Sequence, residues 1–237
     1  MKTLFPIILL FLTISTFLSA QDMETRALPF FNKINYEGHG SIFLEPADKA
    51  EIKIQDSEQY SAAHVRAEVR DETLYIWYDF ESGSITPLDH QRVDIYVHYP
   101  ELEALNLNGE IRVDAIHPIT GDHFELTAEG KIDLRLPLEV QHFDATLAGE
   151  MSVNFSGKVT HENISFEGRG SVNTMELYAQ SADITTDGMG HLYLPYIESM
   201  NAVATGTSEI KYTKNAACKV GATKKGLGKI VVKEQRM

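Results

Sequence analysis

Cysteine is almost absent from the 237-residue sequence, since Cys218 is the only one. A single cysteine cannot form a disulfide within the chain, so packing and backbone hydrogen bonds must stabilise the fold. Cys218 could still pair between chains or react. We expect a small, partly buried residue instead.

Basic residues are also scarce. The 21 Lys and Arg residues are outnumbered by 34 Asp and Glu residues, which gives a formal charge of −13. Nucleic-acid binders usually need a basic face, so we expect no nucleic-acid partner. Hydrophobic residues at 43% and charged residues at 23% exclude a mostly disordered chain and a multi-span membrane protein.

Long apolar runs are confined to the N-terminus. Lys2 precedes the nearly continuous apolar stretch Leu4–Leu18, and Leu18-Ser19-Ala20 resembles a signal-peptidase site. The pattern predicts a signal peptide over residues 1–20 and an exported chain in the periplasm, at the outer membrane or outside the cell. The alternative is an uncleaved N-terminal anchor. Gln21 after the predicted cut excludes a lipid-anchored cysteine, and no second apolar run predicts a membrane span.

Motifs that carry chemistry are missing as well. The nine histidines include no His-x-His or helical His-x₃-His pair, so the pattern predicts no metal site. There is no Asp/Asn-rich calcium loop and no Gly-x-Ser-x-Gly elbow. Gly221–Lys229 superficially resembles a phosphate loop, but Leu227 follows Gly226 where lysine is required. The sequence therefore predicts no catalytic residue, no metal and no cofactor.

Glycine, by contrast, recurs at a regular interval. Segments that begin at Phe124, Phe143, Ile164 and Ile184 each reach a glycine six positions later and an apolar residue eight positions later. From residue 109 to residue 228 the repeat positions are 18 to 21 residues apart, which indicates a repeat architecture. The corner glycines of this repeat are Gly40, Gly109, Gly130, Gly149, Gly170, Gly190 and Gly228, and Ser208 takes the place of one more.

Residues within each repeat alternate in character. Phe124, Leu126 and Ala128 share one face, whereas Glu125 and Thr127 share the other, as is typical of a strand with one buried face. Glycine gives room and access to positive φ where the chain turns toward its own interior. The pattern predicts an all-β fold, in which coils of about 20 residues stack as a β-solenoid.

Stacking would bring equivalent outer positions to within about 4.8 Å of one another. One predicted column reads Glu110, Lys131, Glu150, Ser171, His191, Glu209 and Lys229, and the next reads Arg112, Asp133, Ser152, Asn173, Tyr193 and Lys211. Alternating charges in these columns suit pairing between neighbouring coils. The prediction requires that Gly130, Gly149 and Gly170 stack.

The region from about residue 25 to residue 100 is less regular. Val65–Phe80 predicts two strands around Asp71-Glu72, and Arg92–Pro100 predicts another. We expect this region to be the first part of a single domain over residues 21–237, whose regular repeats span residues 101–233.

Tyr75 and Trp77 are the candidate binding residues. They alternate with Leu74 and Ile76, which are expected to point inward. Exposed Tyr and Trp side chains can stack on sugars or contact a protein partner. The alternative is that a neighbouring layer or loop covers them.

The exported N-terminus, the segment Arg26–Glu45, the segment Val93–Val113 and the Gly-x-[Ile/Val/Met/Leu] repeats together resemble the auto-transporter adhesin "head GIN" domain family. The resemblance covers residues 25–233 and implies a right-handed, single-stranded parallel β-helix in the cell envelope. It supplies no catalytic residues.

Three functions follow as hypotheses. The first is a non-enzymatic, adhesin-like envelope protein that binds another protein, a glycan or itself. The second is a carbohydrate-active β-helix enzyme, a polysaccharide lyase or hydrolase, although fold analogy is weak evidence for function. The third is a structural module that assembles with itself, because open ends of a solenoid can stack.

Overall fold

The computed structural model describes residues 23–55, 64–79, 93–213 and 218–233. The predicted signal peptide lies outside them. Strands make up 83% of the structure, and the described residues contain no helix. Accordingly, none of the described segments forms a helix that could span a membrane. The predicted all-β class is confirmed.

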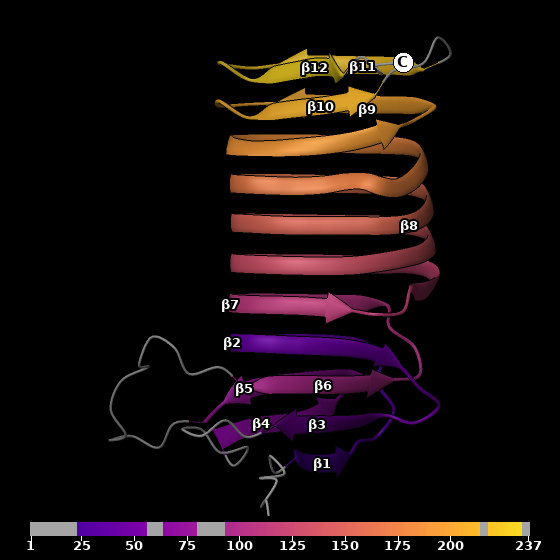
Figure 1. Cartoon of the computed structure of the whole chain (residues 1–237), viewed down its shortest axis with the longest axis vertical. Helices are drawn as coiled ribbons and strands as arrows, with labels where there is room; N and C mark the ends of the chain where they lie inside the picture. Colours follow the sequence, from indigo (N-terminus) through magenta and orange to yellow (C-terminus); the bar gives the residue numbers. More distant parts are fainter. Residues whose placement is uncertain (1–22, 56–63, 80–92, 214–217, 234–237) are drawn as a thin grey trace, which may run out of the picture.

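Twelve strands of the described residues form one large, open sheet (Figure 1). Its main order is β1-β3-β6-β2-β7-β8-β10-β12. Off this path, β5 pairs with β2 and β4 pairs with β5, while β9 pairs with β8 and β11 pairs with β9. The strands are β1 (Met23–Ala27), β2 (Lys33–Pro46), β3 (Glu51–Gln55), β4 (Val65–Arg70), β5 (Thr73–Tyr78), β6 (Asp94–Tyr99), β7 (Ala104–Ala115), β8 (Ile119–Tyr196), β9 (Ser199–Ala204), β10 (Glu209–Thr213), β11 (Lys219–Lys224) and β12 (Lys229–Lys233).

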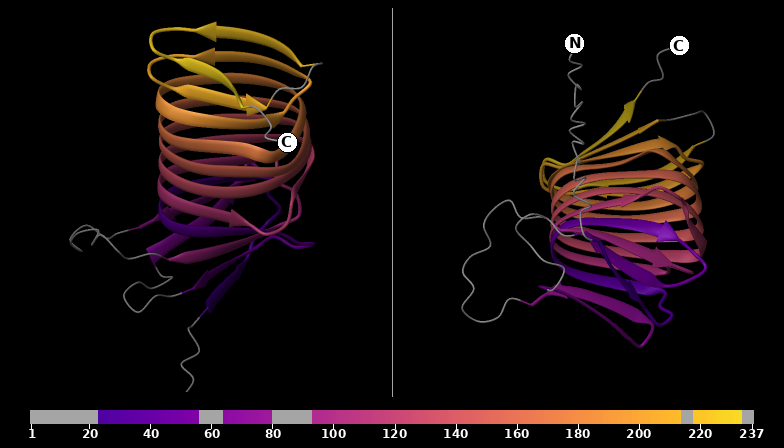
Figure 2. Two further views of the ribbon diagram at one scale, coloured as in Figure 1. Left: turned by 45° about the horizontal axis from the view of Figure 1, so that its top comes forward. Right: turned by 60° about the horizontal axis from the view of Figure 1, so that its bottom comes forward.

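From β7 onward the strands pair in parallel with positions one repeat further along the chain. Gly109 lies opposite Gly130, Ser181 opposite Ser199 and Glu209 opposite Lys229. We call each such stretch of chain a rung. Figures 1 and 2 show the rungs stacked along the long axis, with strands in parallel rows on opposite sides of the molecule. The repeat length read from the sequence is therefore the distance along the chain between paired positions.

The apolar face of each rung lies inside. Phe124 and Leu126 are fully buried, whereas Glu125 is exposed, as the alternation predicts. Phe124 stacks on Phe143 of the next rung with a centroid distance of 6.1 Å, and Phe143 meets Phe155 edge-on at 4.8 Å. Each fully buried large apolar side chain contributes about 1.5–3 kcal/mol, so this continuous interior is the main source of stability.

Glycine lets neighbouring rungs approach closely at one position. Gly130 has a φ of +115°, and a Cβ there would lie 2.2 Å from the carbonyl oxygen of Gly109. Gly149 has the same φ and the same distance to the carbonyl oxygen of Gly130. A side chain would be strained at this φ and would also collide with the backbone of the preceding rung.

After Gly149 the column differs from the prediction. A Cβ on Gly168 would lie 2.0 Å from the Gly149 carbonyl oxygen, whereas Gly170 lies on Met151. The predicted stacking of Gly170 on Gly149 is therefore wrong by two residues. The observed column is Gly38, Gly109, Gly130, Gly149, Gly168, Gly188, Gly206 and Gly226. The other predicted corner glycines have different neighbours: Gly40 lies against Val93, Gly190 against the Phe166 ring and Gly228 against Ala204.

The outer columns carry the same shift. Glu110 and Lys131 form the expected ion pair at 2.9 Å. Glu150 then pairs with Arg169 at 3.1 Å, where Ser171 was predicted. A shift of two residues keeps every side chain on its face of the sheet, so the alternation alone fits either register.

At the N-terminal end the sheet becomes antiparallel. β4 and β5 form a hairpin whose turn residues Asp71 and Glu72 have φ of +49° and +58°. Positive φ at both turn residues matches the twist of a two-residue hairpin. β6 and this hairpin confirm the strands predicted in the region. β1, β3 and β6 pair antiparallel at this end of the stack (Figure 1).

Candidate functional site

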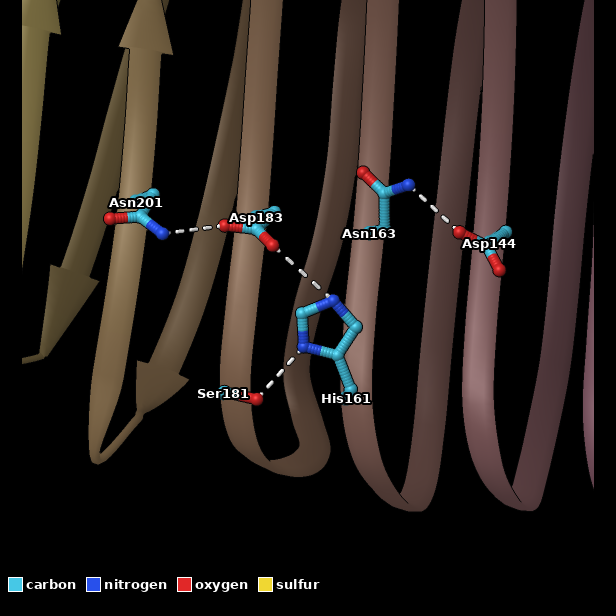
Figure 3. Close-up of polar contacts among 6 residues, drawn as sticks. All are labelled: Asp144, His161, Asn163, Ser181, Asp183 and Asn201. Atoms are coloured by element: carbon cyan, nitrogen blue, oxygen red, sulfur yellow. Dashed lines mark hydrogen bonds and ion pairs between the residues drawn. The ribbon is translucent and has the colours of Figure 1, made fainter.

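A row of polar side chains crosses the outer face of successive rungs in β8 and β9. We call Asp144, His161, Asn163, Ser181, Asp183 and Asn201 the polar ladder (Figure 3). They face outward because every second residue of each strand does so. Ladder residues that hydrogen-bond to each other on neighbouring rungs are 18 to 20 positions apart along the chain.

Hydrogen bonds connect the rungs along this ladder. The Asn163 amide donates to Asp144 Oδ1 at 2.8 Å, and the Asn201 amide donates to Asp183 Oδ1 at 2.8 Å. His161 contacts both residues of the next rung: its Nδ1 lies 2.8 Å from Ser181 Oγ and its Nε2 lies 3.4 Å from Asp183 Oδ2. These contacts fix the side chains before any ligand arrives, which lowers the entropy lost on binding.

The ladder continues to His123, whose Nε2 lies 2.8 Å from Asp144 Oδ2. Partial burial acts to raise the pKa of Asp144, but hydrogen bonds from His123 and Asn163 outweigh it and hold the pKa below its ordinary value. Asp144 is therefore a carboxylate at neutral pH and accepts hydrogen bonds only.

A hollow in the surface overlaps the ladder. Its lining includes His161, Ser181, Asp183, Ser199, Asn201 and Lys219. Hydroxyl, amide, imidazole, carboxylate and ammonium groups thus border one space, and together they offer both donors and acceptors. Fixed donors and acceptors around a recess suit a ligand that carries both, as a compound rich in hydroxyl groups does.

Beneath the ladder lies a buried acid, Glu162. It is fully buried, and neither carboxyl oxygen has a hydrogen-bond partner among the described residues. The contacts of its neighbours, His161 with Ser181 and Asn163 with Asp144, place it level with Ala182 and Phe143 of the adjacent rungs. Burial raises the pKa of Glu162 to about 8, so the side chain is mainly neutral at pH 7.

Ser181, His161 and Asp183 also have the residue types of a hydrolytic triad. Here the imidazole lies between the hydroxyl and the carboxylate. Nearby backbone groups are committed to pairing, since Ser181 and Asp183 lie opposite Ser199 and Asn201. An oxyanion would therefore have to be stabilised by side chains. In addition, the Asp183 side chain is 49% exposed, so solvent weakens its electrostatic interaction with the His161 imidazole. The arrangement is better suited to binding a polar ligand than to acyl transfer.

The described residues contain no cluster of His, Cys, Asp and Glu that could hold a metal ion. Cys218 is partly buried and forms no disulfide in this structure.

The sequence-derived candidates Tyr75 and Trp77 lie elsewhere, on β5 near the N-terminal end of the stack (Figure 1). Both are half-buried. The Arg70 guanidinium covers the Tyr75 ring at 4.9 Å, and Trp77 lies opposite Arg66 of β4 and Glu37 of β2. The structure does not bring them together with the polar ladder.

The ladder itself was missed in the sequence. Asp144, Asn163, Asp183 and Asn201 recur at intervals of 18 to 20 residues, which is the repeat length. Aligning the polar positions of the repeats, as well as the glycines, would have revealed them. Glu162 would have stood out in the same alignment as an acid at an apolar position.

Comparisons with known proteins agree with this architecture. A family model described as "putative auto-transporter adhesin, head GIN domain" matches residues 30–216. None of the curated proteins compared with the chain matches it.

Three solved structures are similar over nearly their whole length. A protein named as a putative adhesin from Bacteroides fragilis has a TM-score of 0.77 at 21% identity, covering 90% of this chain and 98% of that one. A putative lipid binding protein from Parabacteroides distasonis has a TM-score of 0.57 at 15% identity, covering 91% and 96%. A putative adhesin from Parabacteroides merdae has a TM-score of 0.55 at 14% identity, covering 91% and 96%.

At these identities the three structures show a shared fold and nothing about ligands. The family match covers most of the sequence and confirms the resemblance inferred from the repeats. The chain belongs to the family described as "putative auto-transporter adhesin, head GIN domain".

Proposed function

We propose that this protein is an exported, non-enzymatic binding module of the cell envelope. In this proposal, residues 21–237 form one domain that coils as a single-stranded, right-handed parallel β-helix after removal of residues 1–20. Parallel pairing between positions 18 to 21 residues apart and the family's adhesin description support it. The corner glycines would serve the coiling and have no ligand of their own.

The ligand that fits the polar ladder best is an uncharged glycan. The observation that carries this assignment is that hydrogen-bonded Asp183, Asn201 and His161 line the same surface hollow. Sugar hydroxyls both donate and accept, as these groups do. The carboxylates Asp144 and Asp183 would repel an anionic polymer at this face.

A glycan array with the wild-type protein and the double variant Asp183→Ala/Asn201→Ala tests the assignment. Each hydrogen bond to a charged group contributes about 1.5–3 kcal/mol, so we expect the variant to bind at least tenfold more weakly. The matched control is Asn154→Ala/Asn173→Ala, which removes a similar contact of 3.0 Å on another column. Equal loss in both variants, or binding only to a protein or to a second copy of the chain, would contradict the proposal.

A second candidate function is hydrolysis, and the contact of His161 with Ser181 and Asp183 favours it. The discriminating assay measures release of product from polysaccharide and ester substrates by the wild type and by Ser181→Ala. Binding without turnover supports the module. Turnover that disappears in Ser181→Ala supports the enzyme.

Tyr75 and Trp77 remain a proposed second contact, for a protein partner or for self-association. Because Trp77 is half-buried between Arg66 and Glu37, Trp77→Ala should weaken an interaction through β5 without altering glycan binding at the ladder. Size-exclusion chromatography over a range of concentrations measures self-association. An unchanged elution profile and unchanged partner binding would remove Tyr75 and Trp77 from the site.

A further inference from the structure

The charge of the chain is distributed unevenly. Eight of the 21 basic residues lie between residues 211 and 237, where Glu234 is the only acidic residue. The remaining 33 acidic residues all precede residue 211. Figures 1 and 2 place β11 and β12 at one end of the stack and β1 at the opposite end. The described residues 218–233, which include β11 and β12, carry five lysines and no acidic residue, so an acidic protein has one basic end.

An exposed leucine stands at the centre of this basic end. The turn between β11 and β12 reads Lys224-Lys225-Gly226-Leu227-Gly228-Lys229, and Leu227 is 73% exposed. We call these six residues the basic turn. Its three lysines are exposed too. An apolar side chain flanked by three cations fits a partner surface that is both anionic and apolar.

Backbone hydrogen bonds hold Leu227 in this position. Its N–H donates to the Gly206 carbonyl at 2.8 Å, and the Lys225 N–H donates to the Ala204 carbonyl at 2.9 Å. The Gly228 N–H closes the turn onto the Lys225 carbonyl at 3.3 Å. The leucine is therefore presented by the rigid edge of the stack.

A second exposed apolar residue, Met189, lies in the same outer column. The Thr207 N–H donates to the Gly188 carbonyl, just as the Leu227 N–H donates to the Gly206 carbonyl. In this register Met189, Thr207 and Leu227 lie at equivalent positions of successive rungs. Met189 is 65% exposed. Nearby acidic groups are already engaged: Glu209 contacts Lys211 at 2.8 Å, and Asp187 accepts from the Gly188 N–H at 2.7 Å.

We infer that the basic turn docks on an anionic lipid surface. Lys224, Lys225 and Lys229 would bind headgroup phosphates, while Leu227 enters the boundary between headgroups and acyl chains. A soluble polyanion would use the lysines but has no apolar region to receive Leu227 and Met189. Because the anionic lipid would repel the acidic remainder of the molecule, the long axis would point away from the lipid surface. The polar ladder would then stay accessible.

The basic turn lies beyond residues 30–216, which the family model matches. The inference therefore concerns this chain and is independent of the proposed glycan site.

Flotation of the full chain with lipid vesicles tests the inference. We expect binding to vesicles rich in phosphatidylglycerol that falls as salt is raised, because charge attraction is screened. Pure phosphatidylcholine vesicles measure the binding that the apolar N-terminal run contributes by itself. Each lysine near an anionic surface adds about fivefold in affinity, so Lys224→Gln/Lys225→Gln should bind at least tenfold more weakly.

Two matched controls separate the basic turn from general effects. Leu227→Ser should weaken vesicle binding several-fold, whereas Ile116→Ser, at a residue that is 78% exposed, should not. Lys158→Gln, at an exposed lysine outside the basic turn, should also bind as the wild type does. Thermal unfolding of each variant verifies that it is folded.

Three results would overturn the inference: no preference for phosphatidylglycerol, equal binding by Leu227→Ser and wild type, or binding to immobilised heparin that matches vesicle binding in every variant. The last result would identify a site for soluble polyanions. None of these outcomes alters the expected glycan-array result.

Discussion

Asp144 of the polar ladder and Glu162 beneath it show how position decides the protonation state of a carboxyl group. Asp144 faces outward and accepts hydrogen bonds from Asn163 and His123, which lower its pKa. Glu162 faces inward without a partner among the described residues, and burial raises its pKa to about 8. Alternation within each rung thus places Asp144 at the surface as a carboxylate and Glu162 in the interior as a neutral acid.

Glu162 should make stability depend on pH. The unfolded chain loses this proton near pH 4.5 and the folded chain near pH 8, so the folded state is stabilised by protonation and loses up to about 5 kcal/mol as pH rises through that range. Urea unfolding at pH 5, 6.5 and 8 measures the effect. Glu162→Gln keeps the shape, cannot ionise and should remove most of this slope.

Because Glu162→Gln changes this carboxyl group alone, the informative quantity is the difference in unfolding free energy between the wild type and Glu162→Gln at each pH. A constant difference from pH 5 to pH 8 would show that Glu162 does not carry a raised pKa in the folded protein.

At the scale of the strand, the sequence predicts the faces better than the register. Phe124, Leu126 and Glu125 lie on the expected faces because alternation depends on each residue alone. Register depends on which glycine of Gly168-Arg169-Gly170 meets Gly149, and both glycines satisfy the same period of two. Contacts between rungs depend on register, which explains why Glu150–Arg169 was not predicted.

The glycine column should tolerate no side chain. Gly130→Ala would place a Cβ 2.2 Å from the Gly109 carbonyl oxygen at a φ of +115°, so we expect a loss of about 3 kcal/mol in unfolding free energy. Gly121→Ala is the control for the collision alone, since Gly121 also has a positive φ, of +158°, but a Cβ there would have no other atom within 4 Å beyond its chain neighbours. Urea midpoints compare the two. Similar midpoints for both variants would mean that close approach of the rungs at Gly130 is not required.

At the scale of the whole molecule, stacking converts sequence periodicity into surface patterns. The repeats predicted the all-β class and the family, because both rest on spacing. They did not predict the polar ladder, because Asp183, Asn201 and His161 become neighbours only when three rungs are placed in register. The basic end follows from the order of charges along the chain, but its exposed Leu227 depends on the folded turn.

The proposed function depends above all on binding of an uncharged glycan at the polar ladder. A crystal structure of the protein with the strongest ligand from the glycan array tests it most directly. We expect sugar hydroxyls hydrogen-bonded to Asp183 and Asn201, within the hollow that Lys219 borders. A sugar held at Tyr75 and Trp77, or one that leaves the ladder unoccupied, would contradict it.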